Sequence, residues 1–156
     1  MRYRTRVIAF DPGEQTGVAI GTIDANVLEV EHFGWDRWMD AAYRFKRGAE
    51  GFDHCVYESW KLTARGAKNL KGSDMPWSQF IGMMKMVCHD NDITLSVQEP
   101  AEKYVIDARM GDLDYLPKGE VEHHRDALRH LIKYAVENHN VKSIEYETRT
   151  VEVPEP

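Results

Sequence analysis

Three acidic residues occupy positions from which their carboxylates could act together. Asp11 ends an apolar run that begins at Val7, Glu58 ends a second short apolar run, and Asp126 lies near the start of a long helical pattern. Neighbouring carboxylates repel each other and raise each other's pKa unless a cation lies between them. Mg²⁺ prefers a few carboxylates, with waters and phosphate oxygens completing its shell. The three acids therefore predict a site for a divalent cation.

Each acid also has an ordinary structural explanation. Asp11 fits an Asp-Pro-Gly turn, Glu58 an exposed strand end, and Asp126 the surface of a helix. A chain with 26 acidic residues often places three of them near element ends by chance. Local detail favours the functional interpretation of Asp11, because Pro12 has no N–H and stops the hydrogen-bonded ladder directly after it.

Two histidines precede Asp126. His123 lies three residues before Asp126, so the two side chains share a helix surface. An imidazole is a metal ligand or an acid/base group in such a place, and a solvated histidine otherwise. At 100° per residue, His124 falls at the centre of the apolar stripe of this helix and Asp126 falls nearly opposite. His124 is therefore the alternative neighbour of the metal site.

The elements that must position these residues follow from hydrophobic periodicity. Alternating apolar residues predict five strands and helical spacing predicts four helices. The strands are expected at residues 4–11, 16–23, 27–34, 53–59 and 93–97, and the helices at 35–47, 76–88, 100–110 and 122–138. Three successive strands followed by alternating helices and strands indicate an α/β fold with a mixed sheet flanked by helices.

Length and composition restrict the class of protein. A chain of 156 residues is expected to form one domain, which we place at residues 1–143, followed by an acidic tail or extra strand at 144–156. Two distant cysteines and the lack of a signal or membrane-spanning segment predict a cytoplasmic protein without a membrane partner. The net charge of −6 argues against a generic nucleic-acid binder, although a local basic patch decides the field near a site.

One basic stretch follows Glu58 directly. The segment "KLTARGAKNLKG" holds no acid, and we expect it to contact DNA phosphates or else to be a solvated loop. Trp60 and Trp77 bracket it and are either stacking partners for an unpaired base or core residues. The candidate DNA-binding residues of this region are Trp60, Lys61, Arg65, Lys68 and Lys71. Trp35, Trp38 and Met residues 83, 84 and 86 are expected in the core or at a dimer contact.

Five motifs in order resemble those of RuvC-like Holliday-junction resolvases, in the ribonuclease H-like superfamily. "IAFDPGEQTGVAIG" resembles the first hairpin of that family, "HCVYES" its second acidic strand, and "QFIGMMKMV" the helix that follows. "LSVQEPAEKYVI" is similar to the next strand, and "HHRDAL" to the closing helix motif. The resemblance covers about residues 5–138 and implies a ribonuclease H-like mixed five-stranded sheet, with a three-strand antiparallel meander and two parallel strands.

The resemblance also implies a mechanism. Asp11, Glu58, His123 and Asp126 would be the catalytic residues and would hold two Mg²⁺ ions, for which Mn²⁺ can substitute. One ion would activate water and the other would stabilise the leaving 3′ oxygen, while Lys103 would contact phosphate. The implied function is the resolution of four-way DNA junctions by paired symmetric nicks, carried out by a homodimer.

Two alternatives remain open at this point. A related nuclease acting on flaps, forks or RNA would use the same carboxylates. A catalytically inactive module that binds branched DNA would keep the fold and lose the metals. The stretch between Lys103 and His123 looks shorter than in typical members, and the acidic tail has no counterpart in the motifs above.

Overall fold

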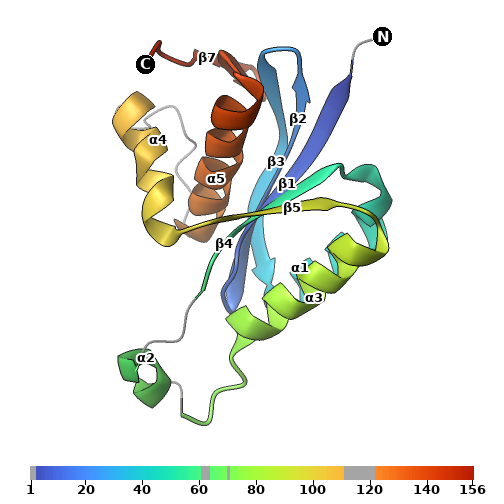
Figure 1. The fold of residues 1–156 in the computed structure, drawn as a ribbon, viewed down its shortest axis with the longest axis vertical. Helices are drawn as coiled ribbons and strands as arrows, with labels where there is room; N and C mark the ends of the chain where they lie inside the picture. Colours follow the sequence, from blue (N-terminus) through green and yellow to red (C-terminus); the bar gives the residue numbers. More distant parts are fainter. Residues whose placement is uncertain (1–2, 61–63, 70, 111–121) are drawn as a thin grey trace.

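The protein is built on one twisted sheet of seven strands in the order β5-β4-β1-β2-β3-β6-β7. The computed structural model describes residues 3–60, 64–69, 71–110 and 122–156 (Figure 1). The strands are β1 Arg4–Asp11, β2 Gln15–Asp24, β3 Val27–Arg37, β4 His54–Glu58, β5 Thr94–Gln98, β6 Ser143–Tyr146 and β7 Arg149–Glu152.

The pairing of the strands is mixed, as the sequence predicts. β1, β2 and β3 form the antiparallel meander. β4 pairs in parallel with β1, and β5 in parallel with β4. All five predicted strands are present, so the expected mixed sheet is confirmed, but two further strands extend it beyond β3. There β6 pairs in parallel with β3, and β7 antiparallel with β6.

The two added strands come from the acidic C-terminal segment. Their backbone is tied to the sheet, and alternate side chains of β6 are buried: Ile144 has no exposed surface and Tyr146 is 3% exposed. The intervening glutamate, Glu145, is exposed. This alternation is the ordinary pattern of a strand with one buried face, so the acidic composition of the segment belongs to the solvent side of the sheet.

Helices cover both faces of the sheet. Figure 1 shows α1 and α3 on one face and α4 and α5 on the other. The helices are α1 Trp38–Gly48, α2 Ala64–Asn69, α3 Pro76–Asp90, α4 Lys103–Met110 and α5 Glu122–His139, with short 3₁₀ turns at Ala49–Gly51 and Pro100–Glu102. In the part of the chain that the structure describes, no helix is both long and apolar enough to span a bilayer.

Two predicted elements differ in the structure. The helix expected from Trp35 begins instead at Trp38, whose N–H donates to the carbonyl of Glu14, and Trp35 belongs to β3, where it pairs with Gly17. Aromatic residues suit a strand that is open on one face, and this preference prevails over the helical spacing. The basic segment after Glu58 contains a short helix, α2, which lies away from the sheet in Figure 1.

The face under α1 and α3 is an apolar core. Phe10 of β1 contacts Phe45 of α1 and Phe80 of α3 edge-on, with ring centroids 5.1 and 5.0 Å apart. Met84 and Cys55 fill the space between them without exposed surface. Edge-to-face aromatic pairs add about 0.5–1.5 kcal/mol each beyond the burial of their area, so this side contributes strongly to stability.

The face under α5 is apolar over most of its area and very closely packed. Leu128, Leu131 and Ile132 of α5 are almost completely buried against β1, β2 and β3. Gly21 of β2 makes this approach possible: a Cβ there would lie 2.8 Å from Leu28 Cδ1 and 3.2 Å from Leu131 Cδ2. Contacts below 3 Å are repulsive, so any larger residue would move α5 or its neighbours.

Candidate active site

Asp11 and Glu58 lie side by side at the ends of adjacent parallel strands. Phe10 pairs with Tyr57 across β1 and β4, and the two acids are the next residue on each strand. Residues at alternate positions share a face, which places both acids with Val7 and Val56 on the α5 side. Both carboxylates are buried, at 4% and 7% exposure. The predicted juxtaposition of these two residues is therefore present.

The turn after Asp11 is held by local hydrogen bonds. The hydroxyl of the fully buried Thr16 donates to the carbonyl of Gly13 at 2.8 Å and accepts from its N–H at 3.4 Å. Such side-chain bonds let a short turn satisfy its own backbone groups. The turn therefore fixes the end of β1 and with it the position of the Asp11 carboxylate.

Asp126 reaches the same place from the first turns of α5. Lys103, the first residue of α4, donates to Asp126 Oδ2 at 2.9 Å and to Glu58 Oε1 at 3.2 Å. All three side chains are between 10% and 12% exposed. One ammonium group thus joins the carboxylates of a strand and a helix that are far apart in the sequence.

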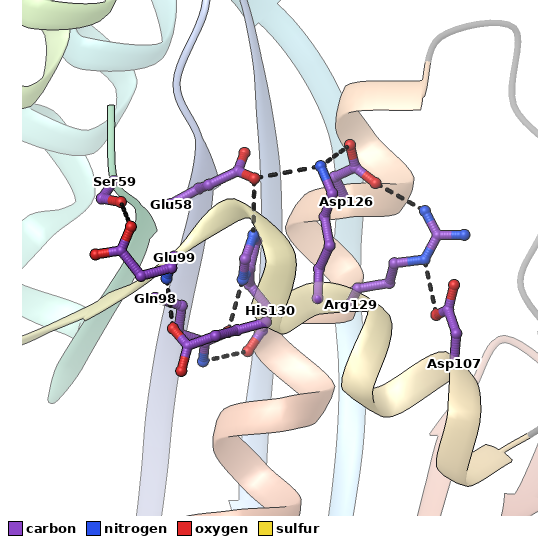
Figure 2. A network of polar contacts seen from close by, with 10 residues as sticks. Glu58, Ser59, Gln98, Glu99, Asp107, Asp126, Arg129 and His130 are labelled. Atoms are coloured by element: carbon purple, nitrogen blue, oxygen red, sulfur yellow. Dashed lines mark hydrogen bonds and ion pairs between the residues drawn. The ribbon is translucent and has the colours of Figure 1, made fainter. Parts of the chain in front are cut away.

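The second oxygen of Asp126 is held by another cation. Arg129 donates to Asp126 Oδ1 at 2.7 Å and to Asp107 Oδ1 of α4 at 3.0 Å. Figure 2 shows the guanidinium between the two carboxylates. Because Arg129 presents several donors in a rigid plane, it orients Asp126 and fastens α4 to α5 with the same group.

Glu58 has a buried histidine beneath it. Gln98 of β5 pairs with Glu58, and its amide group donates to the backbone carbonyl of His130 at 3.2 Å. The oxygen of that amide faces His130 Nδ1 at 2.6 Å, so Nδ1 carries a proton. His130 Nε2 lies 3.7 Å from Glu58 Oε1 and makes no hydrogen bond among the described residues. Gln98 therefore orients the imidazole toward the carboxylate.

Glu58 and Lys103 each favour the charged form of the other. Burial raises the pKa of Glu58, but His130, a hydrogen bond with Asp11 and the positive charge of Lys103 lower it more, to about 2. Burial lowers the pKa of Lys103, whereas its contacts with Asp126 and Glu58 raise it above its ordinary value. Glu58 and Lys103 are therefore both charged at neutral pH.

The donor set can be compared with what Mg²⁺ requires. The carboxylates of Glu58 and Asp126 face one cation, the Lys103 ammonium, and the carboxyl group of Asp11 is hydrogen-bonded to Glu58. Oxygen ligands of this kind fit a hard divalent ion. In the present conformation, no three His, Cys, Asp or Glu groups of the described residues form a metal-binding cluster. The carboxyl oxygens are thus suitable ligands for the ion, and the Lys103 ammonium contacts the same oxygens in this conformation.

The structure brings together four of the predicted site residues: Asp11, Glu58, Asp126 and Lys103. The backbone of His123 and His124 lies in the first turn of α5, but their side chains are outside the described part, so the choice between them stays a prediction. Asp126 falls nearly opposite the apolar stripe of α5 on a helical wheel, and in the structure α4 packs on that side and buries it as well.

The predicted DNA-binding residues that the structure describes have different settings. Trp60 stacks on Trp77 with ring centroids 5.7 Å apart and planes 8° from parallel. Lys68 on α2 and Lys71 are exposed. Arg65 belongs to α2, its side chain lying outside the description, and Lys61 lies outside the described residues altogether. Their contact with DNA stays a prediction.

Three residues of the site were not selected from the sequence: His130, Gln98 and Arg129. The spacing of four between Asp126 and His130 and of three between Asp126 and Arg129 places them on one helix surface, and this signal was available. For Gln98, the signal was its place at the end of a predicted apolar strand, equivalent to that of Glu58. A neutral side chain attracts less attention than an acid in such a position.

The fold defined by this sheet and these helices is the ribonuclease H-like α/β fold, with an acidic site at the ends of β1 and β4. Among solved structures, it is similar to RuvC of Thermus thermophilus in complex with Holliday junction substrate, with a TM-score of 0.62 and 12% identity over 84% of this chain and 92% of that one. A second Thermus thermophilus RuvC structure gives 0.61 and 11%, over 84% and 93%. No protein-family model and no curated protein matches the sequence. The resemblance to RuvC-like resolvases in fold is thus confirmed.

Proposed function

We propose that the chain is a divalent-metal-dependent DNA endonuclease that resolves four-way junctions by paired symmetric nicks. The observation that carries this proposal is the convergence of Asp11, Glu58 and Asp126 on one buried site, in a fold similar to that of RuvC. The carboxylates, with His123, would hold two Mg²⁺ or Mn²⁺ ions. Bound metal would supply an activated water and stabilisation of the leaving oxygen.

The chain's own residues have separate tasks in this proposal. Lys103 would donate to a non-bridging oxygen of the scissile phosphate and hold it over the carboxylates. Arg129 keeps the Asp126 carboxylate in one orientation, and Gln98 keeps the His130 imidazole against Glu58. Because Arg129 and Gln98 are already hydrogen-bonded to their partners, Asp126 and His130 need little reorientation, whereas Lys103 has to leave the two carboxylates when metal and phosphodiester bind.

A four-way junction has two strands to cut, which requires two copies of the site. We propose a homodimer that uses the outer surface of α1 and α3, where Met39, Tyr43 and Met86 are 47%, 50% and 60% exposed. Lys46 and Asp90 lie at the same surface, and a two-fold axis can bring the lysine of one copy to the aspartate of the other. The buried free thiols of Cys55 and Cys88 agree with a cytoplasmic location.

The test is the cleavage of a labelled four-way junction by the wild type and by Asp11→Asn. We expect Mg²⁺-dependent paired nicks from the wild type and at least about a 100-fold slower reaction from the variant, the typical cost of losing one electrostatic contact to a transition state. Junction binding should persist, because the substitution removes a negative charge.

Asp92→Asn is the matched control, since Asp92 is exposed at the end of α3 and has a positive φ of 53° that Asn accepts readily. This control should cleave like the wild type. Flaps, forks and RNA–DNA hybrids complete the panel: faster cleavage of one of them would assign a different substrate to the same chemistry. If the protein binds junctions but cleaves no substrate in Mg²⁺ or Mn²⁺, the proposed nuclease activity is wrong, and the chain is a catalytically inactive module that binds branched DNA.

A further inference from the structure

A second cleft lies beside the acidic site, at the end of the β1–β2 hairpin. It has a volume of about 440 Å³, within the range of small-ligand sites. Its walls combine two indole rings, one guanidinium, one amide and one carboxylate. The lining residues are Gly13, Glu14, Gln15, Trp35, Arg37 and Trp77.

The cleft belongs to the same row of the sheet as the carboxylates. Asp11 of β1 pairs with Gly17 of β2, and Gly17 pairs with Trp35 of β3. Paired residues of neighbouring strands share a face, and strands are spaced about 4.8 Å apart. The backbone of Trp35 is therefore about 10 Å from that of Asp11. Gly17, which lies between them, has no side chain to separate the indole from the carboxylate.

Trp35 is exposed to an unusual degree for its type. The side chain is 43% exposed, although burial of an indole is strongly favourable. Its neighbours in the cleft are polar: Gln15 and Arg37 pair directly across β2 and β3, and both are exposed. Trp77, on the far wall, stacks on Trp60 two residues after Glu58. The cleft is thus an aromatic and cationic surface bounded on both sides by segments of the acidic site.

We infer that this cleft binds one unpaired nucleobase of the strand that is cut, next to the scissile phosphate. Trp35 stacks on the base, Arg37 neutralises a neighbouring phosphate, and the Gln15 amide faces the edge of the base. Glu14 also lines the cleft and repels phosphate. The base therefore lies on the Glu14 side of the cleft, and the phosphate lies on the Arg37 side. The inference rests on the proposed function in that the strand over Asp11 is nucleic acid.

The test measures binding in the Asp11→Asn background, in which the junction stays intact. Each nucleotide near the branch point is replaced in turn by an abasic residue, and dissociation constants are obtained by fluorescence anisotropy. One abasic position should weaken binding about 5- to 100-fold, the usual effect of losing one stacked base. In Trp35→Ala the same position should have no further effect, whereas Trp35→Phe should keep most of it.

Two further variants separate stacking from folding and from general charge. Tyr3→Ala removes another exposed aromatic ring, 79% exposed, and should bind like the background protein. Arg37→Gln should weaken binding of every junction and reduce its salt dependence by about one unit of slope. Circular dichroism establishes that each variant is folded.

Unchanged affinity in folded Trp35→Ala, or a full abasic effect that persists in this variant, would overturn the inference. If Trp35→Ala does not fold, undiminished affinity in Arg37→Gln together with no abasic effect at any position overturns it equally. All of these experiments measure binding, so they test the cleft separately from the nuclease activity. If one abasic position weakens binding but the wild type cuts no substrate, the proposed nuclease is wrong and the base-binding cleft is supported. If the wild type cuts junctions but Trp35→Ala does not change binding, the nuclease is supported and the cleft is wrong.

Discussion

The two faces of the sheet are built from the same strands but hold different contents. Under α1 and α3 the interior is aromatic and aliphatic, with Phe10 at its centre. On the α5 side, one residue further along β1, Asp11 enters a network of charges. Within the described residues, every buried Asp, Glu, His or Lys side chain is on the α5 side: Asp11, His54, Glu58, Asp126, His130 and Lys133.

The difference teaches how one small domain accommodates a costly site. Burying a charge is unfavourable unless partners satisfy it, and a buried ion pair adds little net stability even then. The apolar face has no such cost and stabilises the strands that both faces share. The stability of the fold and the chemistry of the site can therefore be changed separately, which the following variants test.

The largest expected effect on stability is on the apolar face. Phe45→Ala removes a ring that contacts Phe10 and Phe52 and is 2% exposed. The free energy of unfolding should fall by about 3–5 kcal/mol, measured by urea denaturation. The cleavage rate per folded molecule should stay within about twofold of wild type, and Phe45→Leu should lose much less stability. A large loss of rate in the folded fraction would show that the two faces are not independent.

Removing the central cation of the polar face should have the next largest effect. Lys103→Met removes the ammonium that separates Glu58 from Asp126 and leaves two buried negative charges facing each other, at a cost of about 3 kcal/mol in unfolding free energy. Added Mg²⁺ should restore part of the loss and should stabilise the variant more than the wild type, because the ion replaces the ammonium. Urea denaturation with and without Mg²⁺ measures both effects. Lys142→Met, at an exposed position just before β6, is the control and should change neither quantity.

A pH effect is expected from His54, at the other end of β4. Burial, together with the charge of His139, lowers the pKa of His54 from 6.5 to about 4. Below about pH 6.5 the unfolded chain binds a proton that the folded chain excludes, so stability falls as the pH is lowered toward 4. The loss should reach about 2 kcal/mol by pH 4.5.

Urea denaturation at several pH values measures this loss, with His54→Gln as the comparison. Gln can still hydrogen-bond to Ser96, the partner of His54 Nε2 at 2.8 Å, but it does not titrate. The difference between the two proteins should therefore shrink below pH 6.5. Parallel pH profiles would contradict the assignment to His54.

The smallest effect is expected from Arg129, whose role is to position rather than to stabilise. Arg129→Gln should lower the free energy of unfolding by only about 1 kcal/mol, because Asp126 keeps the Lys103 ammonium and the Gln amide can still donate to a carboxylate. Hydrogen exchange of the α4 amides should nevertheless become faster, since the variant loses the link from Asp107 to Asp126. Arg47→Gln, at an exposed position of α1, serves as the control. Unchanged exchange in α4 would exclude this link as its anchor.

The sequence predicted the part of the site that depends on strand geometry. Asp11 and Glu58 end apolar runs, and the period of two assigns them to one face without knowledge of the tertiary structure. Asp126 was predicted as a site residue, although it falls nearly opposite the apolar stripe of its helix. A helical wheel counts apolar residues only, whereas α4 and Lys103 bury a second, polar side of α5.

The remaining differences have a similar origin in tertiary contacts. Trp35 fits a helical spacing with Trp38 and Phe45, yet the hairpin partner Gly17 holds it in a strand. The strand β6 was open as an alternative, because Ile144 and Tyr146 alternate with acids. The sequence around β6 does not show that this strand pairs with β3. The pairing depends on α5, which leads from the β4 side of the sheet to the β3 side.

Gly21 has a consequence for the acidic site, although it lies in the apolar layer under α5. A Cβ at this position would press first on Leu28 Cδ1 of β3, at 2.8 Å, and then on Leu131 Cδ2 of α5, at 3.2 Å. Asp126 is on the same rigid helix, little more than one turn away. Gly21→Ala would therefore displace α5 relative to β2 and β3, and with it Asp126. The distance from Asp126 to Asp11 and Glu58 would change although none of the three acids is altered.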